Sequence, residues 1–291
     1  MALVQAWLST LKKHGWSPAK RQLLGLSGFL LLPLFPHRSA RIANEQFTLV
    51  ELHRHRRDII DHLLRMGLAW RAGQRRDWQT LTRYHRAYWR GTEAHLYHRS
   101  RNRFQTLFLP HFAYLVEELK AALADGNYTT LCEIGTGNGD LLVYLAQELP
   151  SIKHFVGIDL SEQTIADNQE RYTLDAVEFV AADATAWIES HGQPHTIFLT
   201  FGGVFEYFAP AELEQLLDHI ATTLSPTLIL LVEPVAADHD LTHETESRLY
   251  GIEYAFSHNY PHLLQKHGFT ILHQSEKIVF QDTEMVIIAG C

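Results

Sequence analysis

The chain has 291 residues, which is enough for one large domain or two moderate ones with a well-developed core. Charged residues make up 20% and hydrophobic residues 46%, which excludes a disordered chain. Two cysteines exclude a disulfide framework and fit a reducing, cytoplasmic environment. The apolar run 23–35 is too short to span a bilayer comfortably, and a poor cleavage site follows it, so we expect neither a membrane anchor nor a signal peptide.

Charge is divided unevenly along the chain. Residues 1–127 hold 20 lysines and arginines against 9 aspartates and glutamates, a balance of +11. Residues 128–291 hold 5 against 24, a balance of −19, and the two parts give the net charge of −8. Such a split favours two structural units, and we expect the basic one to dock on the acidic one rather than on nucleic acid.

The first part of the chain predicts helices only. Amphipathic spacing favours helices over 2–14, 18–32, 43–72, 78–97 and 111–124. No alternating apolar run and no Asn-Gly turn interrupts them, so we expect no strand before residue 128.

Beyond residue 128, short apolar runs alternate with helical stretches. The runs cover 131–134, 155–160, 177–181, 196–201, 227–232, 270–272 and 285–289. Strands that alternate with helices of about 10–15 residues indicate βαβ units and a parallel sheet. The last two runs are expected to pair as an antiparallel hairpin at the end of that sheet.

One stretch, Thr129–Ala146, combines an apolar strand, a glycine-rich turn and the start of a helix. Glu133 ends the apolar run, and Gly135, Gly137 and Gly139 follow at every second position. Glycine allows the sharp turn and lets a ligand lie against bare backbone. The stretch resembles motif I, E-x-G-x-G-x-G, of the class I S-adenosylmethionine-dependent methyltransferases.

Two acidic residues extend this resemblance. Asp159 ends the second apolar run, 20 residues beyond Gly139, which is about the length of one βαβ crossover. It is placed to accept hydrogen bonds from ribose, as an NAD site would also require. Asp183 follows the third run, where the family has an Asp that binds the adenine amino group; capping of the helix from Ala184 is its alternative role. The resemblance implies S-adenosylmethionine as cofactor and implies these ligands for it: Glu133, Gly135, Thr136, Gly137, Asn138, Gly139, Asp159, Leu160, Asp183, Ala184, Thr200 and Gly202.

The loop after the fourth run, Thr200-Phe-Gly-Gly, faces the sulfonium in this family. It lacks the Asn/Asp-Pro-Pro-aromatic motif of enzymes that methylate adenine or glutamine amides, which disfavours those acceptors. Candidate catalytic residues lie beyond it: Glu206, Tyr207 and His258. His239 and His243 stand four apart, but no third ligand follows at fixed spacing, so we expect no metal.

The resemblance covers residues 110–291 and implies an α/β fold. It predicts a mostly parallel seven-stranded sheet flanked by helices, with residues 1–109 as an all-helical domain that acts as lid. Arg101 or Arg103 is placed to pair with the methionine carboxylate. Lid or substrate contacts are expected from Tyr88, Trp89, Tyr97 and Arg103.

The implied activity is methyl transfer to an oxygen or nitrogen of a small molecule in specialised metabolism. One alternative uses the same cofactor differently: its amino nitrogen attacks its own aminobutyl chain and releases methylthioadenosine, as in azetidine-2-carboxylate formation. Another is an RNA methyltransferase that uses the basic, aromatic segment Tyr84–Phe104 for stacking, which the acidic second half disfavours. The oligomeric state, including a homodimer, stays open.

Overall fold

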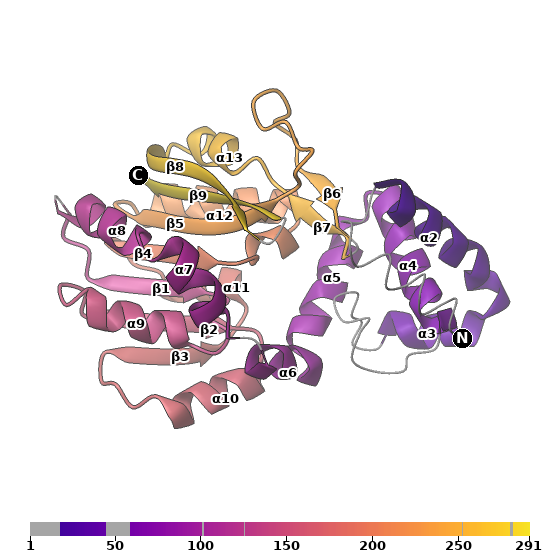
Figure 1. Cartoon of the computed structure of the whole chain (residues 1–291), viewed down its shortest axis with the longest axis horizontal. Coiled ribbons are helices and arrows are strands. Elements are labelled where there is room, and N and C mark those ends of the chain that lie inside the picture. Colours follow the sequence, from indigo (N-terminus) through magenta and orange to yellow (C-terminus); the bar gives the residue numbers. More distant parts are fainter. Residues whose placement is uncertain (1–17, 45–58, 101, 125, 252, 280–281) are drawn as a thin grey trace. The chain divides into compact units, whose positions relative to one another are not determined.

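The computed structural model describes residues 18–44, 59–100, 102–124, 126–251, 253–279 and 282–291 (Figure 1). The expected helix over 2–14, residues 45–58 of the expected helix over 43–72, and Arg101 lie outside these ranges. The chain forms two compact units. The first comprises residues up to Tyr88 together with Arg248–Ser257, and the second comprises Trp89–Ser247 and His258–Cys291.

The first unit is mainly helical. Its helices are α2 (Pro18–Leu31), α3 (Pro36–Asn44), α4 (Ile59–Gln74) and α5 (Trp78–Trp89), with a 3-10 turn at Leu32–Leu34. A short antiparallel ribbon, β6 (Arg248–Tyr250) and β7 (Ala255–Ser257), joins them from far along the sequence. This ribbon was not expected from the sequence, since three-residue strands leave no readable alternation.

Helices α2 and α4 cross with Gly28 and Gly67 at their closest approach. A Cβ at Gly28 would overlap the carbonyl oxygen of Leu63, and one at Gly67 would overlap the backbone of Gly28. The backbones therefore approach more closely than side chains would permit. Around this crossing, a buried cluster includes Ile42, Leu64 and Leu81.

The second unit contains the predicted sheet, in the order β3-β2-β1-β4-β5-β9-β8. Its strands are β1 (Thr130–Ile134), β2 (His154–Asp159), β3 (Val177–Ala181), β4 (Thr196–Phe201), β5 (Leu228–Val235), β8 (Thr270–Val279) and β9 (Asp282–Gly290). The pairs among β1 to β5 are parallel, whereas β9 runs antiparallel to β5 and to β8. The mostly parallel sheet and its terminal hairpin are thus confirmed.

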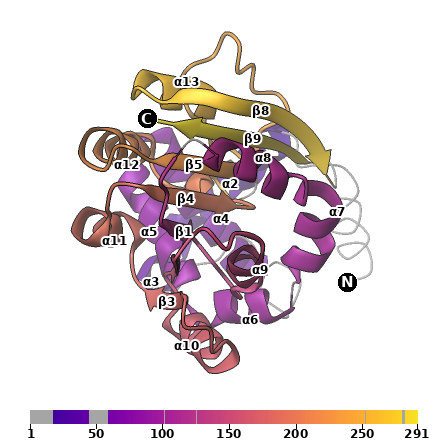
Figure 2. The same ribbon diagram turned by 90° about the vertical axis from the view of Figure 1, so that its left-hand side faces the viewer.

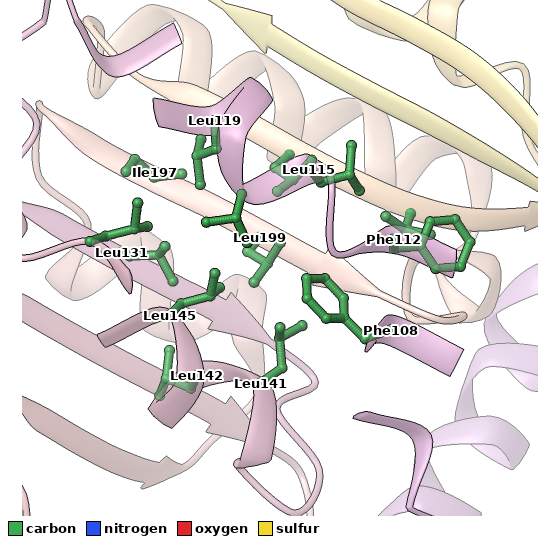
Figure 3. Close-up of a cluster of buried hydrophobic side chains, with 14 of the residues drawn as sticks. Phe108, Phe112, Leu115, Leu119, Leu131, Leu141, Leu142, Leu145, Ile197 and Leu199 are labelled. Carbon is green, nitrogen blue, oxygen red and sulfur yellow. The ribbon is translucent and has the colours of Figure 1, made fainter. Parts of the chain in front are cut away.

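Helices cover both faces of this sheet. They are α8 (Leu115–Leu123), α9 (Asp140–Glu148), α10 (Glu162–Arg171), α11 (Ala184–His191), α12 (Pro210–Thr223) and α13 (Tyr260–Lys266). Figure 2 shows α9 on one side of the strands and α11 and α12 on the other. Two buried clusters result: one joins α8 and α9 to the sheet (Figure 3), and the other joins α12 and α13 to its opposite face.

Residues 89–109 group with the second unit, and not with the helices before them. This segment contains α6 (Thr92–Ser100), a π-helical turn (Phe104–Phe108) and the start of α7 (Leu109–Phe112). Phe104 packs against Tyr144 of α9, with ring centroids 5.1 Å apart, and Phe108 packs against Phe201 at 5.4 Å. The contacts therefore divide the chain after Tyr88, whereas the sequence placed the boundary after residue 109. Apolar burial on the sheet is the physical reason, because these phenylalanines belong to its core.

Candidate functional site

Four neighbouring parallel strands end at one edge of the sheet, and the predicted ligand-binding residues follow them. Because the carboxyl ends of parallel strands form the binding crevice in this type of fold, the residues after β1, β2, β3 and β4 lie in one region. Gly135, Gly137 and Gly139 all have positive φ, of 71°, 52° and 74°. A Cβ at Gly135 would lie 2.6 Å from Val204, and one at Gly139 would lie 2.7 Å from Phe179. The turn requires glycine both for its backbone angles and for space.

Asp159 fixes this turn. Its buried carboxylate accepts the backbone N–H of Gly137 at 3.0 Å and that of Ser161 at 2.9 Å. Asn168 donates to the carbonyl of Gly137 at 2.7 Å, so the central glycine is held from both sides. A carboxylate oxygen can accept more than one hydrogen bond, so Asp159 still has acceptor capacity for ribose hydroxyls. Leu160 follows it and is half-buried.

Glu133 lies beneath the same turn. Thr136 donates its hydroxyl to the Glu133 carboxyl group at 2.6 Å. Burial, opposed by the hydrogen bond from Thr136 and assisted by the nearby carboxylates of Asp159 and Asp140, raises the pKa of Glu133 to about 8. Glu133 therefore stabilises the turn from the inside. Asn138 is half-buried and donates to Asp140 at 2.6 Å.

Asp183 caps the helix that follows β3. Its carboxylate accepts the N–H of Ala186 at 3.5 Å, and Ala184 begins α11. Its other oxygen lies 3.9 Å from the guanidinium of Arg90. The capping role is thus present, and the half-buried carboxylate stands at the same sheet edge as Asp159, where the family binds adenine.

The loop after β4 contains two more glycines with positive φ, Gly202 at 78° and Gly203 at 92°. A Cβ at Gly202 would overlap the guanidinium of Arg103, which also lies 6.0 Å from the ring centroid of Phe201. Thr200 is buried at the end of the strand. Arg103 thus contacts the loop that faces the sulfonium in this family.

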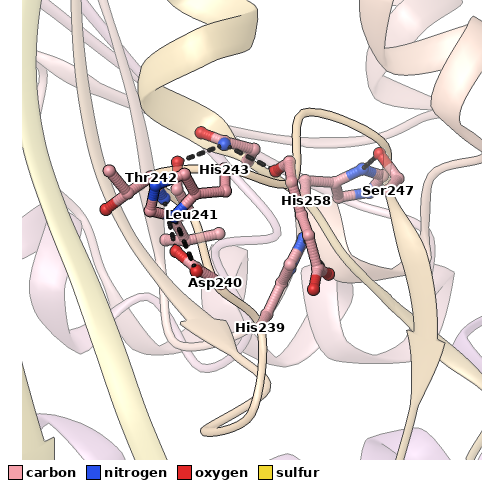
Figure 4. Close-up of polar contacts among 9 residues, drawn as sticks. His239, Asp240, Leu241, Thr242, His243, Ser247 and His258 are labelled. Atoms are coloured by element: carbon pink, nitrogen blue, oxygen red, sulfur yellow. Dashed lines mark hydrogen bonds and ion pairs between the residues drawn. The ribbon is translucent and has the colours of Figure 1, made fainter.

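The three candidate catalytic side chains differ in their surroundings. Glu206 is buried and Tyr207 is half-buried, and the ring of Tyr207 lies 5.4 Å from that of Trp89. His258 is fully buried: Nε2 donates to the carbonyl of Phe205 at 3.1 Å, and Nδ1 accepts from Ser247 at 2.7 Å (Figure 4). Burial lowers the pKa of His258 to about 4. Its imidazole therefore holds the turn that carries Glu206 and Tyr207 in place.

The histidine pair after β5 does not converge on one point. His243 pairs with Asp240 at 2.8 Å on the surface, and His239 is buried 3.9 Å from Glu244 (Figure 4). Within the described ranges, no group of three or more His, Cys, Asp or Glu side chains is arranged to hold a metal ion. Every helix in those ranges is also too short or too polar to cross a membrane.

His98 is a site residue that sequence reasoning missed. It lies on α6, and a Cβ at Gly137 would come within 2.9 Å of its Nδ1. Its Nε2 is buried and has no hydrogen-bond partner among the described residues. The only sequence signal was its membership of the aromatic and basic segment, because its contact with Gly137 joins residues 39 positions apart.

Side chains on and beside α6 reach the ends of three strands at this edge of the sheet. Arg90 reaches Asp183 after β3, His98 reaches Gly137 after β1, and Arg103 reaches Gly202 after β4. Trp89 and Tyr97 pack edge to face at 5.8 Å. Of the predicted lid residues, Trp89, Tyr97 and Arg103 thus belong to the second unit, and Tyr88 is buried at the end of the first.

The residues at this edge fit S-adenosylmethionine. A cradle of bare backbone at three glycines, a buried carboxylate with spare acceptor capacity and an unpartnered buried imidazole nitrogen suit a polar ligand of that kind. The donor set also matches its chemistry, with carboxylates at the ends of β2 and β3 for hydroxyl and amino groups, and with the guanidinium of Arg103 for a carboxylate.

Comparison with known proteins also identifies a methyltransferase domain. A family model described as a methyltransferase domain matches residues 131–227. No curated protein matches the chain. Among solved structures, magnesium protoporphyrin IX methyltransferase from Synechocystis PCC 6803 with bound S-adenosylhomocysteine is 19% identical with a TM-score of 0.50, over 72% of this chain and 100% of that one.

Two further solved structures match part of this chain. N-methyltransferase NodS from Bradyrhizobium japonicum WM9 is 14% identical with a TM-score of 0.48, over 68% of this chain and 97% of that one. The 1,6-didemethyltoxoflavin-N1-methyltransferase of Burkholderia thailandensis is 19% identical with a TM-score of 0.48, over 67% and 83%. Residues 131–227 thus form a methyltransferase domain, which contains the glycine turn and both acidic residues.

Proposed function

We propose that this enzyme transfers the methyl group of S-adenosylmethionine to an oxygen or nitrogen of a small-molecule acceptor. The observation that carries the proposal is the aromatic wall beside the loop after β4, where the rings of Trp89 and Tyr207 lie 5.4 Å apart. Methyl transfer requires the acceptor in line with the methyl–sulfur bond, so positioning supplies much of the rate. Apolar walls also assist a reaction in which the sulfonium loses its charge.

The loop sequence supports a small acceptor. Thr200-Phe-Gly-Gly lacks the Asn/Asp-Pro-Pro-aromatic motif associated with adenine and glutamine amides. The acidic balance of residues 128–291 also disfavours a polyanionic acceptor. We expect Trp89, the last residue of α5, to contribute to acceptor selection.

The test uses methyl-labelled S-adenosylmethionine and a cell extract separated by ultrafiltration into small-molecule and macromolecular fractions. We expect label to enter the small-molecule fraction only, and no transfer with the Gly137→Asp variant, which fills the cofactor cradle. Label in RNA or protein would contradict the proposal. Incubation with the cofactor alone is the second arm: methylthioadenosine formed without acceptor would instead establish the cyclising use of the aminobutyl chain.

A further inference from the structure

His98 is positioned against the part of the site that holds the cofactor. Its ring contacts the central glycine of the turn, and the rings of Trp89 and Tyr97 each lie 5.6 Å from it. The buried Nε2 has no hydrogen-bond partner in the part of the chain that the structure describes. An unsatisfied buried polar atom has a free-energy cost, so its presence at a ligand site calls for a partner.

Charged groups surround this imidazole on two sides. Burial lowers the pKa of His98 below its usual range; the carboxylate of Asp159 opposes this, and Arg103 and the neighbouring His95 reinforce it. His98 is therefore neutral near pH 7. It is also close enough to Asp159 and Arg103 for both charges to affect its pKa.

The order of the groups in the cofactor indicates which of them would lie near His98. In S-adenosylmethionine the sulfur is bonded to the ribose C5′ on one side and to the aminobutyrate chain on the other. Asp159 is the expected ribose ligand, and Arg103 is the candidate partner of the carboxylate at the far end of that chain. Because Gly137, which His98 contacts, is hydrogen-bonded to Asp159, we expect His98 to lie near the ribose C5′ and the sulfur bonded to it.

We propose that His98 contacts the sulfonium end of bound S-adenosylmethionine and has to be neutral for the cationic cofactor to bind. This makes His98 a positioning residue that distinguishes the substrate from the product, because S-adenosylhomocysteine has the same shape without the charge. A protonated imidazole would repel the first and leave the second nearly unaffected. Two unit charges a few ångströms apart in a partly buried site change affinity by about tenfold or more.

The experiment is a calorimetric titration of the full chain with S-adenosylmethionine and with S-adenosylhomocysteine, at about pH 8 and about pH 5. In the wild type, where the pKa of His98 is lowered by burial, we expect the affinity for S-adenosylmethionine relative to S-adenosylhomocysteine to fall at the lower pH to the extent that the imidazole becomes protonated. His98→Gln, which is neutral at every pH, should remove this change. His98→Lys, which is always charged, should weaken S-adenosylmethionine selectively even at the higher pH.

The matched control is His154→Gln, at the exposed start of β2, which should behave as the wild type. A His98→Lys variant that binds S-adenosylmethionine as tightly, relative to S-adenosylhomocysteine, as the wild type does would overturn the inference, and so would a change with pH that is equal in the wild type and in His98→Gln. The inference rests on the cofactor of the proposed function but not on its acceptor. It would stand if the acceptor proved to be a macromolecule, whereas a wild type that binds neither ligand would overturn the cofactor assignment as well.

Discussion

The carboxylate of Glu233, near the end of β5, accepts the backbone N–H of Val204 at 3.0 Å. The same side chain accepts the N–H of Phe205 at 3.1 Å, and Tyr260 approaches it at 3.5 Å. His258 holds the carbonyl side of the same turn through Phe205. Two buried side chains therefore fix the loop that carries Glu206 and Tyr207, and the geometry of this loop depends on groups that do not face the ligand.

Glu233→Gln tests this arrangement through pH. Burial raises the pKa of Glu233 to about 7, above the ordinary value near 4.5, so between these values the folded state binds more protons than the unfolded state. The contribution to stability is complete below about pH 4.5 and is lost as pH rises through about 7, with a magnitude on the order of 3 kcal/mol. We expect Glu233→Gln to remove this loss.

The measurement is the free energy of unfolding in urea across this pH range. The exposed Glu276 provides the control, and Glu276→Gln should keep the pH dependence of the wild type. If the wild type and Glu233→Gln lose stability in parallel as pH rises, Glu233 is not the titrating group.

Gly137→Ala tests the cofactor cradle. A Cβ at this position would lie 2.9 Å from His98 at a φ of 52°, so alanine introduces strain and fills space that a ligand would use. We expect the affinity for S-adenosylmethionine to fall by at least about tenfold, as measured by calorimetry. The control is Gly268→Ala, at a φ of 87°, where a Cβ meets no described atom within 4 Å. Equal affinities for the two variants would remove the steric argument.

The sequence was sufficient for the parts of the site that follow from local pattern. The glycine turn, Asp159 and Asp183 each stand directly after an apolar strand, and parallel pairing then brings them to one edge. Ser161 caps α10, and its side chain accepts the N–H of Thr164.

The remaining site residues could not be read from local pattern. His98 and Arg90 act on residues 39 and 93 positions away, and a helical spacing does not specify which face meets the sheet. Glu233 lies within an apolar strand, where a single acid could equally point to solvent. The boundary after Tyr88 was not predicted for the same reason. The phenylalanines that attach residues 89–109 to the sheet have the same sequence pattern as those of any buried helix.

Gly28→Ala tests the close crossing of α2 and α4. A Cβ there would overlap the carbonyl oxygen of Leu63, so the helices have to separate. We expect a loss of about 1–3 kcal/mol, because overpacking of a tight interface outweighs the higher helix propensity of alanine. Calorimetric melting with and without S-adenosylmethionine identifies the transition of the second unit by its shift. Ser27→Ala, one residue earlier, should leave the other transition unchanged, and an equal melting temperature for both variants would contradict the close contact.

Arg103→Gln tests the assignment of the methionine carboxylate. The guanidinium lies against Gly202 and over Phe201, where a charge-assisted pair with that carboxylate would form. S-adenosylmethionine and S-adenosylhomocysteine both contain the carboxylate, and methylthioadenosine does not. We expect the variant to weaken the first two by about tenfold or more and to bind the third as the wild type does.

The Arg103 comparison separates charge recognition from general damage to the site. Arg99→Gln, at an exposed position of α6, should leave all three affinities unchanged. A loss of methylthioadenosine affinity in Arg103→Gln would mean that the side chain supports the fold of the loop after β4. Unchanged affinity for all three ligands would mean that the carboxylate is bound by another group. Arg103 is expected to affect the two ligands that contain the carboxylate alike, whereas His98 is expected to distinguish them by the sulfonium charge, so the two variants together locate each end of the methionine moiety.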